Sequence, residues 1–156
     1  MPELDELTRL GQSIWYDYIQ RRFLASGEPE TLIDRGVRGV TSNPSIFEKA
    51  IACSADYDDT IRDLDTQNLE TTAIYEHLAL EDIRTATEQM APVYERTNRR
   101  DGFVSLEVSP KLAYDTRQTV EEAKRLFRTV GKSNLMIKVP GTAAGVPAIR
   151  TLIGLG

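Results

Sequence analysis

Lys138 is the residue whose type and setting most clearly allow covalent chemistry. It follows three apolar residues and precedes Val139 and Pro140, a pattern typical of a buried strand. Burial of a lysine in such a strand disfavours its ammonium form, so the neutral amine becomes more accessible. A neutral amine can attack a carbonyl carbon and form a Schiff base. The alternative is a strand-end lysine that extends to solvent or pairs with a carboxylate.

Two carboxylates occupy similar settings. Glu107 lies within the apolar run 103–109, and Asp17 ends another short apolar run. A carboxyl group near a Schiff base can relay protons as a general acid and base, and a carboxylate can deprotonate a substrate hydroxyl. Each residue has a structural alternative. Glu107 can form an ion pair with a lysine such as Lys138, and Asp17 can cap a helix expected over residues 18–24.

The segment Thr41-Ser42-Asn43 adds hydroxyl and amide groups directly before Pro44. Proline pushes the backbone of the preceding residue away from the helical region. The Asn43 amide can then hold a hydroxyl or carbonyl group of a substrate, and we expect Thr41 and Ser42 to contribute to the same substrate-binding set. The alternative for Asn43 is an Asx-type turn that closes the strand.

Other catalytic and binding motifs are incomplete in the sequence. Gly131-Lys132-Ser133 resembles the end of a P-loop, but the first glycine of that motif would fall at Leu126. The sequence has one histidine, His77, and one cysteine, Cys53, so a zinc site built from His and Cys is excluded. Nothing around His77 suggests a serine triad.

The elements that must position these residues alternate between strands and helices. The predicted strands cover residues 13–17, 38–43, 103–109 and 135–140. The predicted helices cover about 18–24, 54–67, 69–90, 116–130 and 146–155, with Asp115 and Gly131 as the caps of the fourth. This alternation predicts an α/β fold with a parallel sheet covered by helices.

Parallel strands place their C-terminal ends on one edge of the sheet, where ligands bind. The two-residue period of a strand puts Thr41 on the same face as Asn43, and Ser105 on the same face as Glu107. If those faces point into a barrel, Asp17, Asn43, Glu107 and Lys138 converge at its mouth. Because unpaired charges are costly to bury, packing alone explains this convergence poorly.

Composition narrows the function class. The 156 residues carry a net charge of −5 and are 40% hydrophobic, which is typical of a globular domain and lacks the basic footprint of nucleic-acid or anionic-membrane binding. The N-terminus does not read as a secretory signal, and no apolar run is long enough to span a bilayer. With a single cysteine, no internal disulfide is possible, which fits a reducing compartment. We therefore expect a cytoplasmic protein.

The four strand segments resemble the first four barrel strands of transaldolases, in order and spacing. The matching stretches are GQSIWYD at 11–17, GVTSNPSIF at 39–47, VSLEVSP at 104–110 and LMIKVP at 135–140. The resemblance is greatest to the bacterial subgroup in which T-S-N-P is followed by I-F. It implies a (β/α)8 TIM barrel of the class I aldolase type. Residues 1–156 would supply about four βα units, the N-terminal half of that single domain, because a whole barrel needs about 250 residues.

The resemblance also implies an activity, without metal or organic cofactor. The family moves a dihydroxyacetone unit from a ketose phosphate, sedoheptulose 7-phosphate or fructose 6-phosphate, to an aldose phosphate in the pentose phosphate pathway. By resemblance, Lys138 forms the Schiff base and Glu107 acts as general acid and base through a water. Asp17 takes the proton of the C4 hydroxyl, and Asn43 binds the hydroxyl end of the donor. The family's phosphate-binding residues would lie beyond Gly156.

Two alternatives remain beside a transaldolase. One is a catalytically inactive half barrel, and the other is a relative that only cleaves or forms fructose 6-phosphate as an aldolase. In each active case the expected partners are sugar phosphates, with neither nucleic acid nor membrane. A half barrel leaves two edge strands open, which favours pairing with another chain. We therefore expect homo-oligomerisation or other association through these edges.

Overall fold

The computed structural model describes residues 2–155, with a four-stranded parallel sheet of order β1-β2-β3-β4 at its centre. The strands are β1 (Ile14–Asp17), β2 (Val37–Thr41), β3 (Phe103–Glu107) and β4 (Leu135–Lys138). All four lie where the sequence predicts them, and the predicted ends differ from the observed ends by at most two residues. The prediction of an α/β fold with a parallel sheet is confirmed.

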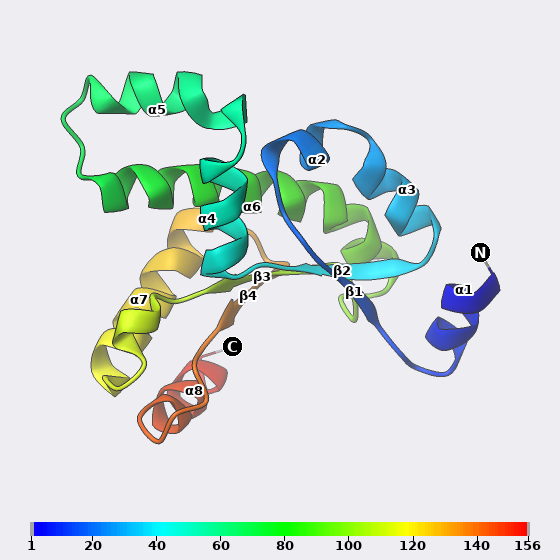
Figure 1. Cartoon of the computed structure of the whole chain (residues 1–156). Helices are drawn as coiled ribbons and strands as arrows, with labels where there is room; N and C mark the ends of the chain where they lie inside the picture. Colours follow the sequence, from blue (N-terminus) through cyan, green and yellow to red (C-terminus); the bar gives the residue numbers. More distant parts are fainter. Residues whose placement is uncertain (1, 156) are drawn as a thin grey trace.

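Helices connect the strands, and Figure 1 shows α2 to α6 gathered on one side of the sheet. The helices are α1 (Pro2–Arg9), α2 (Arg21–Ala25), α3 (Glu28–Asp34), α4 (Pro44–Ala52), α5 (Asp58–Asp65), α6 (Thr71–Arg96), α7 (Thr116–Val130) and α8 (Gly145–Ile153). Two short 3-10 helices, η1 (Ala55–Tyr57) and η2 (Pro110–Leu112), complete the set. Over residues 2–155, no helix is both long enough and apolar enough to cross a membrane.

The caps predicted for α7 are confirmed. The Asp115 side chain accepts a hydrogen bond from the backbone N–H of Gln118, at 2.9 Å, which satisfies a free donor of the first turn. Gly131 ends the helix with φ of 68°, in the left-handed region where glycine carries no Cβ penalty. These two residues fix α7 between η2 and β4.

Several helices differ from the prediction. α1, α3 and α4 were not assigned from the sequence, and α2 begins at Arg21, three residues later than expected. α6 continues past the expected end at Met90, through Pro92, to Arg96. Proline normally ends or kinks a helix. Here the buried side chains of Val93 and Tyr94 hold the turn beyond it against the core.

The two faces of the sheet have different environments. Val40, Val104 and Leu135 point toward the helices and are buried in the main core with Ile83 and Met90 of α6. Burial of each such side chain stabilises the fold by about 1.5–3 kcal/mol. The residues at alternate positions therefore face the opposite side, which the helices α2 to α6 leave open.

Trp15 and Gly39 show how closely β1 and β2 pack on the open face. A Cβ atom added at Gly39 would lie 2.4 Å from the Trp15 ring, so the ring occupies the space a side chain would need. The register pairs these two residues directly. Two positions further along, the same register brings Asp17 beside Thr41, and this positions the end of β1 for the site.

Candidate active site

The C-terminal ends of the four strands meet at one edge of the sheet. The register pairs Asp17 with Thr41 and Glu107 with Lys138. The predicted strand-end positions therefore lie on neighbouring strands, and the edge carries two carboxylates and one amine. In parallel α/β folds this edge is where ligands bind.

Lys138 lies in a polar cluster with Thr41, Ser105 and Glu107. Its Nζ atom is 3.5 Å from Oε2 of Glu107 and donates a hydrogen bond of 3.3 Å to Oγ1 of Thr41. Ser105 Oγ donates to the same Thr41 oxygen at 2.8 Å. The amine is thus held between a carboxylate and a hydroxyl. The ion pair considered as a structural alternative for Glu107 is present, and it places the carboxyl group within reach of any adduct on the amine.

Lys138 is less desolvated than its strand context predicts. Its side chain is 37% exposed and that of Glu107 is 26% exposed. The open face of the sheet accounts for this, because Met136, on the same face of β4, is also exposed. The amine is therefore reachable by a solute from this side.

Asn43 follows β2 and caps α4. Its Oδ1 atom accepts hydrogen bonds from the backbone N–H of Ile46, at 3.0 Å, and from the hydroxyl of Ser45, at 2.6 Å. Pro44 at the first helical position suits this cap, since the N–H that proline lacks has no partner within the helix. With Oδ1 occupied by the cap, Nδ2 makes no hydrogen bond within residues 2–155 and can donate to a ligand.

Asp17 ends β1 with an exposed side chain. Its carboxylate has no hydrogen-bond or ion-pair partner in the part of the chain that the structure describes. The alternative reading of Asp17 as a helix cap is wrong, because α2 begins at Arg21 with Gln20 at the N-cap position. The carboxylate is therefore free for a ligand at the same edge of the sheet.

Ser42 is not brought into the cluster. It is 0% exposed, and its hydroxyl donates a 2.7 Å hydrogen bond to the backbone carbonyl of Ser105. The two-residue period of the strand turns Ser42 away from Thr41. The hydrogen bond of Ser42 links the segment that follows β2 to strand β3, whereas Thr41 faces the lysine.

Ser105 belongs to the cluster although it was not among the predicted site residues. Only 3% of it is exposed, and it links β3 to β2 through Thr41. The signal was available in the sequence, because Ser105 and Glu107 are two residues apart on one strand and so share a face. Ser105 has a short side chain in a buried position, so its residue type alone did not indicate a functional role.

The cavity beside the site has mainly apolar walls and is not lined by Lys138. It has a volume of about 710 Å³ and reaches Asn43 and Glu107, but Phe47, Leu106 and Leu126 give it apolar walls. The polar groups next to the amine, from Thr41, Ser105 and Glu107, lie on the open face around Lys138. We therefore assign the candidate site to the polar cluster. Among residues 2–155, no group of His, Cys, Asp and Glu side chains is arranged to hold a metal ion.

Comparison with known proteins identifies the family. Residues 14–156 match the family model described as transaldolase/fructose-6-phosphate aldolase. The chain is 47% identical over 152 residues to the transaldolase 2 of Nostoc punctiforme, covering 97% of this chain and 40% of that protein. It is 46% identical over 156 residues to the transaldolase of Neisseria gonorrhoeae, covering all of this chain and 44% of that protein.

The geometry defines the class of protein as an α/β fold with polar residues at the C-terminal edge of a parallel sheet. The chain belongs to the transaldolase/fructose-6-phosphate aldolase family. That family folds as a TIM barrel, and the four βα units described above form part of one. The chain spans 40% to 44% of the length of these curated relatives.

Proposed function

We propose that this chain carries the Schiff-base lysine and the acid–base residues of a transaldolase, as the N-terminal half of one barrel domain. The donor would be a ketose phosphate, sedoheptulose 7-phosphate or fructose 6-phosphate, and the acceptor an aldose phosphate. The observation that carries the proposal is the cluster in which Lys138 Nζ lies 3.5 Å from Glu107 and 3.3 Å from Thr41. The family match over residues 14–156 supports it.

The first step forms the imine. The neutral amine of Lys138 attacks the C2 carbonyl carbon of the donor, and the carbonyl oxygen takes up a proton. Loss of that oxygen as water leaves an iminium ion. Glu107, next to the amine, supplies and removes these protons, directly or through a water. At 3.5 Å from the Lys138 amine, the Glu107 carboxylate is close enough to exchange a proton with an adduct formed on that amine.

The second step breaks the C3–C4 bond. Asp17 takes the proton of the C4 hydroxyl, and that oxygen forms the aldehyde of the leaving aldose. The electron pair of the C3–C4 bond moves toward the iminium, which becomes an enamine. Attack of the enamine on the aldehyde of the acceptor forms a new C–C bond, and Asp17 returns its proton to the new hydroxyl. Hydrolysis then releases the product ketose and restores the lysine.

Asn43 and Thr41 would bind rather than react. The Nδ2 atom of Asn43, unused by the helix cap, can donate to a hydroxyl of the dihydroxyacetone unit. Thr41 holds the amine in place, and its own hydroxyl proton can be donated because its oxygen accepts from both Ser105 and Lys138. We propose a cytoplasmic role in the pentose phosphate pathway, with sugar phosphates as partners.

Borohydride trapping tests the proposal. The 156-residue chain, and the longer product where its gene continues, are incubated with fructose 6-phosphate and borohydride and read by peptide mass spectrometry. We expect a reduced adduct on Lys138 that a Lys138→Met variant lacks and a Lys132→Met variant keeps. Absence of an adduct on Lys138 in the longest product would contradict the Schiff-base assignment.

The second candidate is a fructose 6-phosphate aldolase, because the matching family includes both activities. The two are separated by their need for an acceptor. A transaldolase releases little free dihydroxyacetone from fructose 6-phosphate with or without an aldose phosphate, because it passes that unit to the acceptor as part of a new ketose, whereas an aldolase releases dihydroxyacetone without an acceptor. Measurement of free dihydroxyacetone with and without acceptor decides between them.

A further inference from the structure

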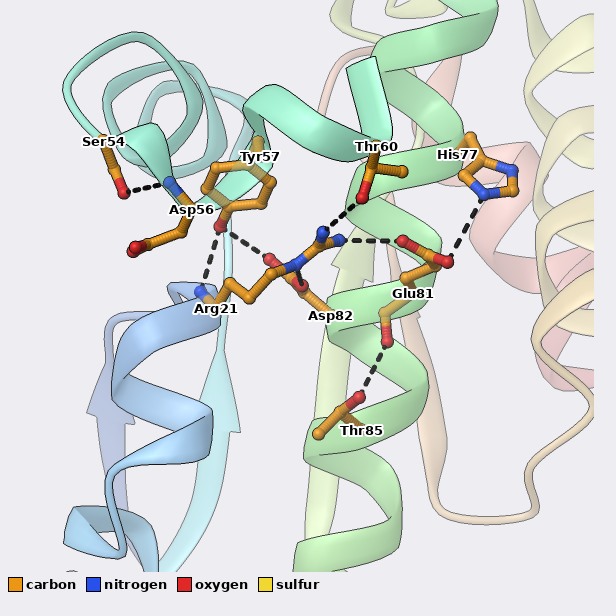
Figure 2. A network of polar contacts seen from close by, with 9 residues as sticks. All are labelled: Arg21, Ser54, Asp56, Tyr57, Thr60, His77, Glu81, Asp82 and Thr85. Atoms are coloured by element: carbon orange, nitrogen blue, oxygen red, sulfur yellow. Dashed lines mark hydrogen bonds and ion pairs between the residues drawn. The ribbon is translucent and has the colours of Figure 1, made fainter. Parts of the chain in front are cut away.

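A polar network joins residues of four elements, α2, η1, α5 and α6 (Figure 2). Arg21 begins α2, and its Nε atom donates to Oδ1 of Asp82, in α6, at 3.2 Å. Its terminal nitrogens donate to Glu81, at 2.8 Å, and to Thr60, at 3.0 Å. Tyr57, in η1, donates its hydroxyl to Oδ2 of Asp82 at 2.7 Å. Both oxygens of Asp82 are therefore used.

The centre of this network is buried. Asp82 is 2% exposed and Tyr57 is 0% exposed, and the guanidinium carbon of Arg21 lies 4.6 Å from the centroid of the Tyr57 ring. A buried carboxylate is costly unless it is paired and hydrogen-bonded, and loss of one partner leaves the other uncompensated. Such an arrangement tolerates little displacement, so it holds α2 and η1 in a fixed position against α6.

The network also holds the backbone that leads away from Asp17. Only three residues separate Asp17 from Arg21, and the backbone N–H of Arg21 donates to the Tyr57 hydroxyl at 3.0 Å. Ile19, in the middle of that segment, is fully buried. On the other side, Asp17 is held by its pairing with Thr41. The position of the Asp17 backbone, from which its carboxylate extends, thus depends on two anchors, the β1–β2 register and the network.

We propose that Asp82, acting through Arg21 and Tyr57, is a positioning residue for the Asp17 carboxylate. This rests on the proposed function, in which Asp17 takes the C4 proton. Asp82 touches no substrate in this scheme. It keeps the segment after β1 at a fixed distance from Lys138, and displacements of about 1 Å are enough to lower a rate by about a hundredfold.

Because the two chemical steps use different residues, an effect of Asp82 on the position of Asp17 can be measured separately from an effect on general stability. Imine formation uses Lys138 and Glu107, whereas cleavage of the C3–C4 bond needs Asp17. Loss of the network should therefore leave the imine and impair cleavage. Borohydride reduction distinguishes the two states, because the uncleaved adduct on Lys138 retains all six carbons and the phosphate of fructose 6-phosphate, and the cleaved adduct retains only dihydroxyacetone.

The experiment measures the ratio of cleaved to uncleaved adduct on Lys138 in the longest product of the gene. Asp82→Asn removes the charge and keeps the shape. Tyr57→Phe removes one hydroxyl and leaves the Arg21–Asp82 pair, so it serves if Asp82→Asn does not fold. Asn134→Ala is the control. It deletes two buried hydrogen bonds, to the carbonyls of Thr87 and Gly102, away from the network.

We expect the total adduct to stay near the wild-type level in both network variants, while the ratio of cleaved to uncleaved adduct falls by about tenfold to a hundredfold. The control should lower the melting temperature without changing the ratio. An unchanged ratio in folded Asp82→Asn and Tyr57→Phe would overturn the inference and leave the proposed function standing. Absence of any adduct in the wild type would overturn the proposed function, and this inference with it.

Discussion

The Thr41 hydroxyl joins two groups of very different exposure. It accepts from Lys138, which is partly exposed, and from Ser105, which is buried. Without this acceptor, the Ser105 hydroxyl would lose its hydrogen-bond partner in a site with little access to water. An unsatisfied buried donor costs about 1–3 kcal/mol. The stability of the cluster therefore depends on Thr41 more than on the exposed lysine.

The Thr41→Val substitution tests this dependence. It keeps the branched shape and removes the acceptor, so we expect the free energy of unfolding to fall by about 1–3 kcal/mol. Thr41→Ser keeps the hydroxyl and loses one methyl group, so its cost should be within about 1 kcal/mol. Urea denaturation measures both. A larger loss for serine than for valine would show that the methyl group, rather than the hydrogen bond, contributes the stability.

Much of the candidate site follows from the alternation of residues along a strand. This period predicted that Glu107 and Lys138 lie at one edge, and the register confirms that they are paired. The same period separates Ser42 from Thr41, but the two were grouped because they share one motif. Whether Asp17 and Asn43 bind substrate stays a prediction, since strand geometry fixes their position and not their role.

At the scale of elements, Asn43 caps α4 through Oδ1, while its Nδ2 makes no hydrogen bond within residues 2–155 and is proposed to bind the substrate. Substitutions at Asn43 can therefore remove one of these two roles and keep the other. Asn43→Ala removes the cap, and we expect a loss of about 0.5–2 kcal/mol in the free energy of unfolding. Asn43→Asp keeps an oxygen acceptor at the N-cap, where a negative charge is favourable, so stability should stay near wild type.

The aspartate variant then isolates the amide. It has no Nδ2 donor, so we expect its KM for fructose 6-phosphate to rise by about tenfold, which corresponds to a lost hydrogen bond of about 1.4 kcal/mol. Steady-state kinetics of the longest gene product measures this. A stable Asn43→Asp variant with wild-type KM would show that Asn43 is only a helix cap.

The strands were predictable as elements, and several helices were not, for identifiable reasons. The four strands are short apolar runs bounded by polar residues. α4 had a usable signal, Asn43 followed by Pro44, but a turn explains the same pair of residues. α3 is only seven residues long and begins after Gly27 without a side-chain cap. The network around Asp82 could not be foreseen, because its residues are far apart in the sequence and form no linear motif.

The Asp82 network also predicts a pH dependence of stability. Burial raises the pKa of Asp82 above its ordinary value of 3.8, against the opposing effects of the Tyr57 hydrogen bond and the Arg21 charge. The folded state therefore binds this proton more tightly than the unfolded state does. The contribution of this protonation to the free energy of unfolding is fully present below pH 3.8 and is lost as the pH rises through the folded-state pKa of Asp82.

Asp82→Asn, which cannot ionise, provides the reference for this effect. We expect the difference in unfolding free energy, wild type minus variant, to decrease as the pH rises above 3.8. Urea denaturation over a series of pH values measures it. A difference that increases with pH would mean that the Arg21 charge outweighs burial and that the pKa of Asp82 is lowered.

At the scale of the whole molecule, the sheet is open on two edges and on one face. Among residues 2–155, β1 and β4 each have a neighbouring strand on one side only, and Met136 and Val146 are among the exposed large apolar side chains. Unpaired strand edges offer backbone donors and acceptors to another chain. An eight-stranded barrel needs twice as many strands as this sheet supplies. The open face and edges therefore favour association of the 156-residue chain.

Two copies related by a twofold axis along the barrel would satisfy both edges, since β4 of one copy can pair in parallel with β1 of the other. We expect the 156-residue chain at micromolar concentration to form dimers or larger species, measured by size-exclusion chromatography with light scattering. Met136→Lys places a charge on the open face and should weaken this association, whereas Arg62→Lys, on the exposed surface of α5, should not. A monodisperse monomer with a cooperative melting transition would contradict the expectation, because it would show that four βα units bury enough apolar surface to be stable alone.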